Sequence, residues 1–76
     1  MIEIYGKKGC GQCEEAKAFL DSHKIEYNYH DLSEKDNRKA RQVYRDNKWK
    51  NLPVVIINDV TIDGYSKAAM ELILDV

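Results

Sequence analysis

The chain has 76 residues, of which 43% are hydrophobic and 33% are charged, and its formal net charge is -1. This length allows one domain over residues 1–76, with the composition of a globular protein and not of a disordered one. A nearly neutral chain argues against a nucleic-acid-binding or membrane-surface protein, and the lack of an apolar run of roughly 18 residues argues against a membrane span.

The first elements follow from the spacing of apolar residues. Residues 2–5 alternate in polarity and predict a strand, and residues 6–9 form a flexible connection to a helix that runs from residue 11 to about 22. Residues 25–30 alternate again and predict a second strand. The core-facing stripe of the helix is predicted to contain Cys13, Ala16, Phe19, Leu20 and His23.

A second helix is predicted to begin at Ser33, because Asp36 follows it at the spacing of a capping pattern. The basic run of residues 38–45 is interpreted as a solvated face of this helix. Three apolar positions are predicted to face the core: Ala40, Val43 and Tyr44. Trp49, with Tyr44, is interpreted as packing at the end of the helix.

The C-terminal part predicts a hairpin and a last helix. Residues 52–57 form the most strongly β-forming run, and Asn58–Asp59 makes a turn into a strand at residues 60–62. Ser66 is predicted to cap the last helix. The core-facing positions of that helix are predicted to be Ala69, Leu72, Ile73 and Val76.

The predicted order is therefore β-α-β-α-β-β-α, an α/β fold. The first two strands, joined through a helix, should be parallel with a right-handed crossover, and the last two should form an antiparallel hairpin. We expect a mixed four-stranded sheet flanked by three helices.

Both cysteines of the chain, Cys10 and Cys13, lie at the start of the first predicted helix. Disulfide exchange requires a thiolate, and the free N–H groups and positive dipole end of a helix N-terminus stabilise one. We expect the N–H groups of Gln12 and Cys13 to point at the Cys10 sulfur, and Lys7 and Lys8 to add positive potential. Cys10 is then the attacking thiol, and Cys13, one turn further and more buried, is the resolving thiol.

Two other uses of the cysteine pair, a structural disulfide and a zinc site, fit the sequence less well. A structural disulfide gains most from closing a long loop, whereas Cys10 and Cys13 enclose only two residues. A zinc site needs two further ligands, and the spacing of His23 and His30 does not fit the usual zinc-finger pattern. A Cys-x-x-Cys motif beside a βαβ unit, with no secretion signal before it, favours a redox protein of the cytoplasm.

Three segments stand in a characteristic order along the chain: Cys10-Gly11-Gln12-Cys13 after the first strand, Leu52-Pro53-Val54-Val55 before the hairpin, and Gly64-Tyr65-Ser66 at the last helix. Over nearly the whole chain, these segments resemble the glutaredoxin family, which has the thioredoxin fold. The sequence is most similar to the NrdH-redoxin branch, whose members supply electrons to ribonucleotide reductase.

The resemblance implies a set of site residues. It implies that the Leu52–Pro53 peptide bond is cis and that backbone groups of Leu52 and Val54 face an extended substrate chain. Cys10 and Cys13 are the implied catalytic residues, with no metal ligand. The implied substrate-binding residues are Lys8, Gln12, Leu52, Pro53, Val54, Gly64, Tyr65 and Ser66.

The sequence also departs from ordinary glutaredoxins. Gly11 and Gln12 stand where those proteins carry a proline and an aromatic residue. Asp63 puts a negative charge where a second glycine of the glutathione site is expected, near the expected position of the glutathione carboxylates. Ser66 still places a helix N-terminus near a glutathione carboxylate. Glutathione therefore remains a possible co-substrate.

The implied function is reduction of protein disulfides by a monomer without a bound cofactor. The redox-active disulfide itself carries the electrons. The implied partner is a protein such as ribonucleotide reductase, and the implied reductant is thioredoxin reductase or glutathione. The alternatives are a glutathione-dependent glutaredoxin and, at lower weight, a dimer that holds an iron–sulfur cluster through Cys10 thiolates.

Overall fold

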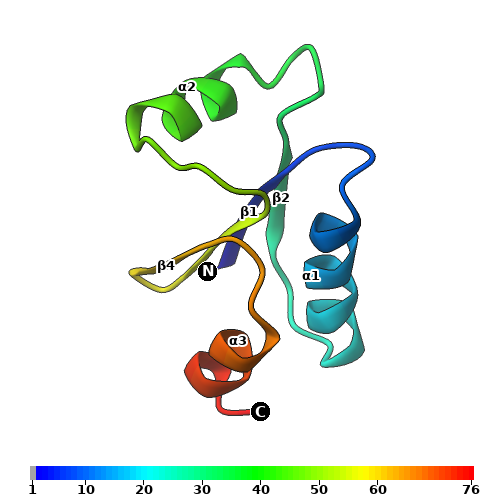
Figure 1. The fold of residues 1–76 in the computed structure, drawn as a ribbon. Helices are drawn as coiled ribbons and strands as arrows, with labels where there is room; N and C mark the ends of the chain where they lie inside the picture. The colour runs from blue at the N-terminus through cyan, green and yellow to red at the C-terminus, as the bar shows by residue number, and fades with distance from the viewer. Residues whose placement is uncertain (1) are drawn as a thin grey trace.

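The computed structural model describes residues 2–76, and its elements follow the predicted order (Figure 1). They are β1 (Ile2–Gly6), α1 (Gly11–Ser22), β2 (Asn28–Asp31), α2 (Arg38–Asp46), β3 (Val54–Ile57), β4 (Val60–Asp63) and α3 (Lys67–Leu74). The sheet order is β2-β1-β3-β4, with β1 parallel to β2 and β3 antiparallel to both β1 and β4. The mixed four-stranded sheet and the α/β fold are therefore confirmed.

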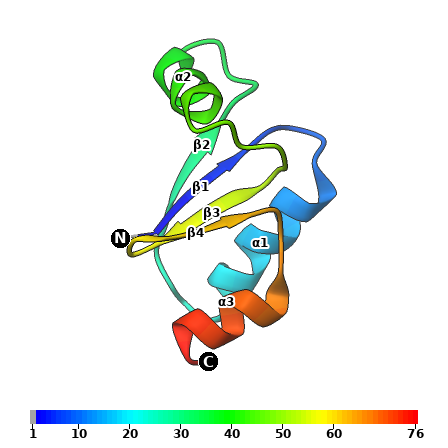
Figure 2. The same cartoon turned by 60° about the vertical axis from the view of Figure 1, so that its left-hand side comes forward.

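The core lies between the sheet and one layer of helices. Figure 2 shows α1 and α3 together on one face of the sheet. The buried side of α1 consists of Cys13, Ala16, Phe19 and Leu20, as predicted. His23 was wrongly included, because it follows the last helical residue and is exposed; the next residue, Lys24, has a φ of 57° and turns the chain away.

The last helix is capped as predicted, but the side of the helix that faces the core differs from the predicted one. The Ser66 hydroxyl accepts the backbone N–H of Ala69 at 3.2 Å. Leu72, predicted to face the core, is 83% exposed, whereas Met70 has no exposed surface. Met70, Ile73 and Leu74 contact the core cluster. The stripe at positions i, i+3 and i+4 thus starts at Met70, and the predicted positions Leu72 and Val76 face solvent.

Strand β2 and helix α2 both begin later in the chain than predicted. Ile25 and Tyr27 pack against the core but precede β2, which begins only at Asn28. Ser33 does not cap a helix, because the Asp31 carboxylate accepts both its N–H and its hydroxyl in a turn that continues from the strand. The helix therefore begins later, at Arg38.

Helix α2 lies beyond one end of the sheet, and none of its residues is buried (Figures 1 and 2). Val43, predicted to face inward, is 38% exposed. Arg41, predicted to face outward, instead donates from its guanidinium to the carbonyls of Leu32 at 3.1 Å, Glu34 at 2.6 Å and Lys35 at 3.2 Å. Polar contacts of this kind, and not burial, hold the start of α2 against the preceding loop.

The sheet face opposite α1 and α3 is partly covered by aromatic side chains. The Tyr5 ring stacks on His30 with centroids 4.6 Å apart and meets Trp49 at 5.2 Å, and Tyr44 meets Trp49 edge-on at 5.7 Å. Tyr44 also donates its hydroxyl to the carbonyl of Asn51 at 2.8 Å. Trp49 and Tyr44 thus pack as predicted at the end of the helix.

Glu3 on this face gives stability a dependence on pH. Hydrogen bonds from His30 at 2.6 Å and Asn28 at 2.9 Å lower the pKa of the Glu3 carboxyl below its ordinary 4.5. A lowered pKa contributes stability above the unfolded-state value, and this contribution is lost as the pH falls through the folded-state value. Glu3→Gln should therefore destabilise the fold at pH 7, by less than about 1 kcal/mol as for other partly exposed pairs. In urea unfolding, this difference should shrink below about pH 4; a difference that is equal at pH 3 and pH 7 would contradict the assignment.

Candidate active site

The two cysteines are joined as a disulfide at the N-terminus of α1, with their Cα atoms 5.2 Å apart. Cys10 is the N-cap residue, and its Sγ accepts the backbone N–H of Cys13 at 3.2 Å. Of the two N–H groups predicted to point at this sulfur, that of Cys13 makes the bond. Cys10 is half-buried, whereas Cys13 has no exposed surface. One sulfur is therefore accessible, and the other lies behind it.

The local sequence explains this geometry. Gly9 has a φ of 75°, a conformation that glycine adopts without strain, and it turns the chain from the β1 loop into the helix. Cys10 is extended, with φ -103° and ψ 107°, as an N-cap residue requires. Its carbonyl accepts the N–H of Glu14 at 3.2 Å, the bond that opens the helix. The sulfur thus occupies the place that a serine or aspartate oxygen takes at ordinary helix starts.

Sequence reasoning missed two residues behind the Cys13 sulfur. A Cβ atom added to Gly6, the last residue of β1, would lie 2.4 Å from the Tyr29 hydroxyl oxygen and 2.9 Å from the Cys13 Sγ. Burial, followed by the charges of Asp31 and Glu14, raises the pKa of Tyr29 above its ordinary value, so its hydroxyl stays protonated at neutral pH. The sequence assigned Gly6 to the connection after the first strand; as the last residue of β1 it is a strand glycine, which often marks a close approach.

Lys8 is tied to the loop after β2. Its ammonium bonds the Glu34 carboxylate and lies 4.0 Å from that of Asp31, and its backbone N–H donates to the Ser33 hydroxyl at 3.3 Å. The hydrogen bond that the ammonium donates to Glu34 raises the pKa of Lys8. Of the two lysines expected to add positive potential beside Cys10, Lys8 is therefore paired with carboxylates of the protein.

The segment around Pro53 lies at the start of β3, and the Leu52–Pro53 bond is cis, as the resemblance implied. Pro53 and Val54 are fully buried. The Pro53 carbonyl accepts the N–H of Gly64 at 2.9 Å, and Val54 is paired with Tyr5 on one side and Asp63 on the other. Of the three predicted contact residues here, only Leu52 has a partly exposed side chain.

Asp63 and Gly64 hold this segment from the side of β4. The Asp63 carboxylate accepts the backbone N–H groups of Asn51 at 3.0 Å and Lys50 at 3.2 Å. Gly64 has a φ of 107°, which a residue with a side chain rarely adopts. Asp63, chosen from the sequence as a charge that opposes glutathione, thus also fixes the loop that leads to Pro53.

The comparisons with known proteins agree with this geometry. Residues 2–62 match the sequence pattern of the glutaredoxin family. The chain belongs to the glutaredoxin family. A search of curated proteins gives no match. Among solved structures, a mutant of the thioredoxin-like protein BC3987 is 25% identical and has a TM-score of 0.85, with 99% of this chain and 95% of that chain covered.

Two further structural neighbours are themselves glutaredoxins. That of Methanosarcina mazei Go1 is 26% identical, with a TM-score of 0.72 over 99% of this chain and 78% of that chain. A buckwheat glutaredoxin, solved as a complex with glutathione, is 24% identical with the same TM-score of 0.72, over 97% of this chain and 68% of that chain. The glutaredoxin described here therefore has the thioredoxin fold and is a thiol–disulfide oxidoreductase with the pair Cys10 and Cys13.

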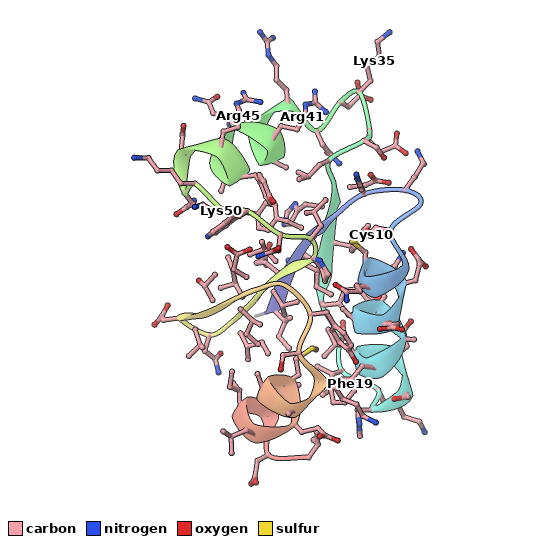
Figure 3. The ribbon with its side chains drawn as sticks, in the orientation of Figure 1. Cys10, Phe19, Lys35, Arg41, Arg45 and Lys50 are labelled. Carbon is pink, nitrogen blue, oxygen red and sulfur yellow. A yellow bond between two sulfur atoms is a disulfide. The ribbon has the colours of Figure 1, made fainter. Side chains whose placement is uncertain are left out.

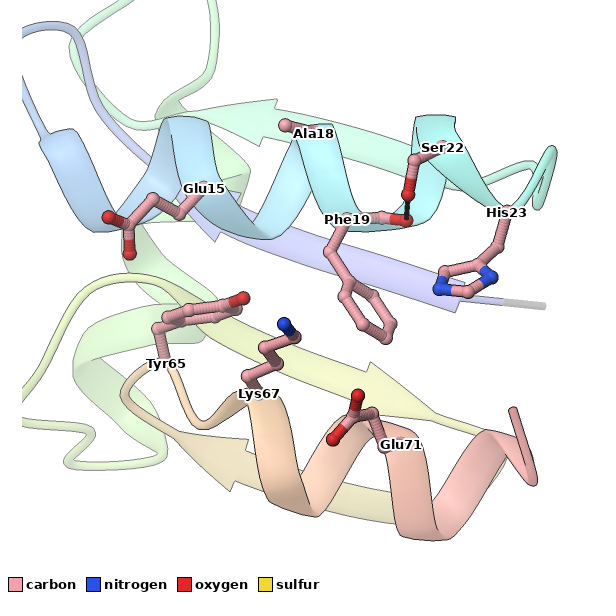
Figure 4. Close-up of a pocket in the computed structure, with 8 residues that line it drawn as sticks. All are labelled: Glu15, Ala18, Phe19, Ser22, His23, Tyr65, Lys67 and Glu71. Atoms are coloured by element: carbon pink, nitrogen blue, oxygen red, sulfur yellow. Dashed lines mark hydrogen bonds between the residues drawn. The ribbon is translucent and has the colours of Figure 1, made fainter.

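Tyr65 of this glutaredoxin lines a cleft between α1 and α3 (Figure 4). Phe19 and Ala18 provide apolar lining from α1, and Lys67 and Glu71 project into the cleft from α3. The cysteines do not line it. The structure thus places Tyr65 in a cleft beside α1, with Ser66 capping α3 and Gln12 exposed in the first turn of α1.

Two absences hold for the part of the glutaredoxin that the structure describes. Residues 2–76 contain no group of three or more His, Cys, Asp or Glu side chains arranged to hold a metal ion. Within the same residues, no helix has the length and apolar character needed to cross a membrane.

Proposed function

We propose that this glutaredoxin is an electron donor of the NrdH type, which reduces a disulfide of a protein partner such as ribonucleotide reductase. The observation that carries this proposal is the arrangement of the two sulfurs: Cys10 is accessible and hydrogen-bonded at a helix N-terminus, and Cys13 is buried directly behind it. The cycle needs no bound metal or organic cofactor, and it suits the cytoplasm, where thiols are kept reduced.

The proposed reaction has two exchanges. The Cys10 thiolate attacks one sulfur of the partner disulfide, forms a mixed disulfide and releases the other partner sulfur as a thiolate, which takes up a proton. The Cys13 thiol then loses its proton and attacks the Cys10 sulfur, which releases the second partner thiolate. The partner gains two electrons, and Cys10 and Cys13 are left as the disulfide that the structure contains.

Thioredoxin reductase is the proposed source of electrons. A glutathione site needs cations for the carboxylates of glutathione, and two features of the structure oppose this. Lys8 is already paired with Glu34 and Asp31, and Asp63 adds a negative charge beside the segment that contains Pro53. The buckwheat neighbour was solved with glutathione, which makes glutathione-dependent recycling the second candidate.

The deciding experiment follows NADPH consumption while the oxidised protein is recycled in two parallel assays. One assay contains thioredoxin reductase, and the other contains glutathione and glutathione reductase. We expect rapid recycling only in the first. Rapid recycling only in the second would make the protein a glutathione-dependent glutaredoxin and would overturn the proposed electron source.

Asp63→Asn tests the role of the charge within the same assay. Asparagine carries no charge and keeps one accepting oxygen, which can accept the N–H of Lys50 or of Asn51 but not both, because the two carboxylate oxygens of Asp63 each accept one of them. We expect glutathione-driven recycling to rise by up to about fivefold, equivalent to ~1 kcal/mol, with thioredoxin reductase recycling unchanged. Asp59→Asn in the exposed β3–β4 turn is the matched control. Equal rates of glutathione-driven recycling for both variants would show that the charge of Asp63 does not oppose glutathione.

A further inference from the structure

The charges of the chain are segregated. Residues 35–50 hold seven of the twelve Lys and Arg residues but only two of the thirteen Asp and Glu residues, so this segment carries +5 and the rest of the chain carries -6. The overall charge of -1 hides this separation. Helix α2 lies inside the segment and buries none of its residues, so core packing does not explain its composition.

Most of these cations are available to a partner. Arg41 is the exception, because three backbone carbonyls occupy its guanidinium. The other six are all exposed, and none of their charged side-chain nitrogens lies within 4.0 Å of a carboxylate oxygen of residues 2–76. We call these six the basic surface: Lys35, Arg38, Lys39, Arg45, Lys48 and Lys50.

The topology places the basic surface at the same end of the sheet as the reactive sulfur. Because β1 and β2 are parallel, the Cys10 loop after β1 and the segment after β2 leave the sheet at one end. The same segment then returns to the start of β3, where Pro53 lies. Figure 3 shows Lys35 and Arg45 of the basic surface at this end, with Cys10 at the near end of α1 and Phe19 toward its far end.

We propose that the basic surface docks an acidic surface of the disulfide-bearing protein partner and so speeds the attack by Cys10. This inference rests on the proposed function. Complementary charge raises association rates by about 10- to 1000-fold at low ionic strength, and salt screens the effect. An acidic partner whose disulfide reaches Cys10 would meet both features at one end of the molecule.

The occupant is inferred to be a protein of limited acidic area and not a nucleic acid. A duplex carries a continuous line of negative charge and would extend from the basic surface over the remaining chain. That remainder carries -6 and repels a polyanion. A compact acidic patch next to a disulfide avoids this repulsion.

The test uses three synthetic peptides that contain the same intramolecular disulfide, flanked by four glutamates, four glutamines or four lysines. Rate constants for their reduction by the reduced protein are measured at about 20 mM and 500 mM salt. We expect the acidic peptide to react about tenfold faster than the neutral one at low salt, and this preference to vanish at high salt. Equal rates for the acidic and neutral peptides at low salt would overturn the docking proposal and leave the redox function standing.

Matched charge reversals locate the effect. Lys39→Glu/Arg45→Glu on α2 should abolish or reverse the preference for the acidic peptide. Lys24→Glu/Lys67→Glu changes the net charge equally at positions outside the basic surface and should retain the preference. An equal loss in both double variants would mean that net charge alone steers the peptide, which would overturn the docking site.

Two further outcomes separate the hypotheses. If the neutral peptide is not reduced by the wild-type protein, the proposed function itself fails. If a 20-base-pair DNA duplex suppresses reduction of the acidic peptide at a lower concentration than a linear polyglutamate peptide of equal total charge, a nucleic acid fits the basic surface better and the proposal for an acidic protein falls.

Discussion

Cys10→Ser is expected to abolish reduction of protein disulfides, whereas Cys13→Ser is expected to leave the attack intact and to accumulate the mixed disulfide. The reason is the unequal access of the two sulfurs, since Cys10 is half-buried at the helix cap and Cys13 has no exposed surface. Without Cys10, a partner disulfide meets no nucleophile. Without Cys13, no sulfur stands behind Cys10 to release the bound partner.

The measurement is mass spectrometry of the reduced variants after mixing with a disulfide-containing peptide, together with the rate of insulin disulfide reduction. We expect a stable adduct with Cys13→Ser, no adduct with Cys10→Ser, and insulin reduction lowered at least about 100-fold in both. An adduct that forms at Cys13 in the Cys10→Ser variant would contradict the assigned roles. Neither the variants nor the reduced wild type contains the disulfide, so both variants should match the reduced wild type in urea unfolding, which separates lost chemistry from lost folding.

Local sequence patterns were sufficient to predict the helices and strands that have one buried face. Helix α1 was predicted with the bounds that the structure shows, because its apolar residues recur at helical spacing and Cys10 can act as its cap. The hairpin of β3 and β4 follows in the same way from a strongly β-forming run and an Asn58–Asp59 turn. The cysteine pair was likewise predicted as the active site from its motif and its place after a strand alone.

The errors arise where contacts that the helical pattern does not show, local or tertiary, decide between alternatives. Ser33 has the pattern of a cap, but the Asp31 carboxylate takes its N–H and hydroxyl first. Arg41 resembles a solvated cation, but backbone carbonyls of the preceding loop surround its guanidinium. In α3, nearly every position is apolar, so the sequence has no polar face to show that Met70 and not Leu72 points inward.

The residues that complete the site are visible only in three dimensions. Asp63 lies twelve positions after Asn51, and its carboxylate fixes the backbone of the loop before Pro53. Nothing in the sequence links those two positions, so Asp63 was read only as a charge. Gly6 and Tyr29 likewise come from neighbouring strands and meet only where β1 and β2 pass beside the Cys13 sulfur.

Gly6→Ala is the second substitution for which we expect a large effect. The new methyl group would lie 2.4 Å from the Tyr29 hydroxyl oxygen, 2.9 Å from the Cys13 Sγ and 3.1 Å from the Tyr29 Cε1, all closer than ordinary contacts. Overpacking of a core of this kind costs about 1–3 kcal/mol. We expect a loss of stability in this range in urea unfolding. We also expect slower release of the mixed disulfide, because the Cys13 sulfur must shift to make room.

A double-mutant cycle with Tyr29→Phe tests the cause of this loss. Removing the hydroxyl eliminates the shortest contact, so Gly6→Ala should cost less in the Tyr29→Phe protein than in the wild type, with a coupling energy above about 0.5 kcal/mol. Gly11→Ala is the matched control, since a Cβ at Gly11 meets no heavy atom within 4 Å, and it should be neutral or slightly stabilising. Additive costs of Gly6→Ala and Tyr29→Phe would show that the hydroxyl does not limit the space at Gly6. If Gly6→Ala then cost no more than Gly11→Ala, the close approach of β1 to the Cys13 sulfur would not constrain the active site.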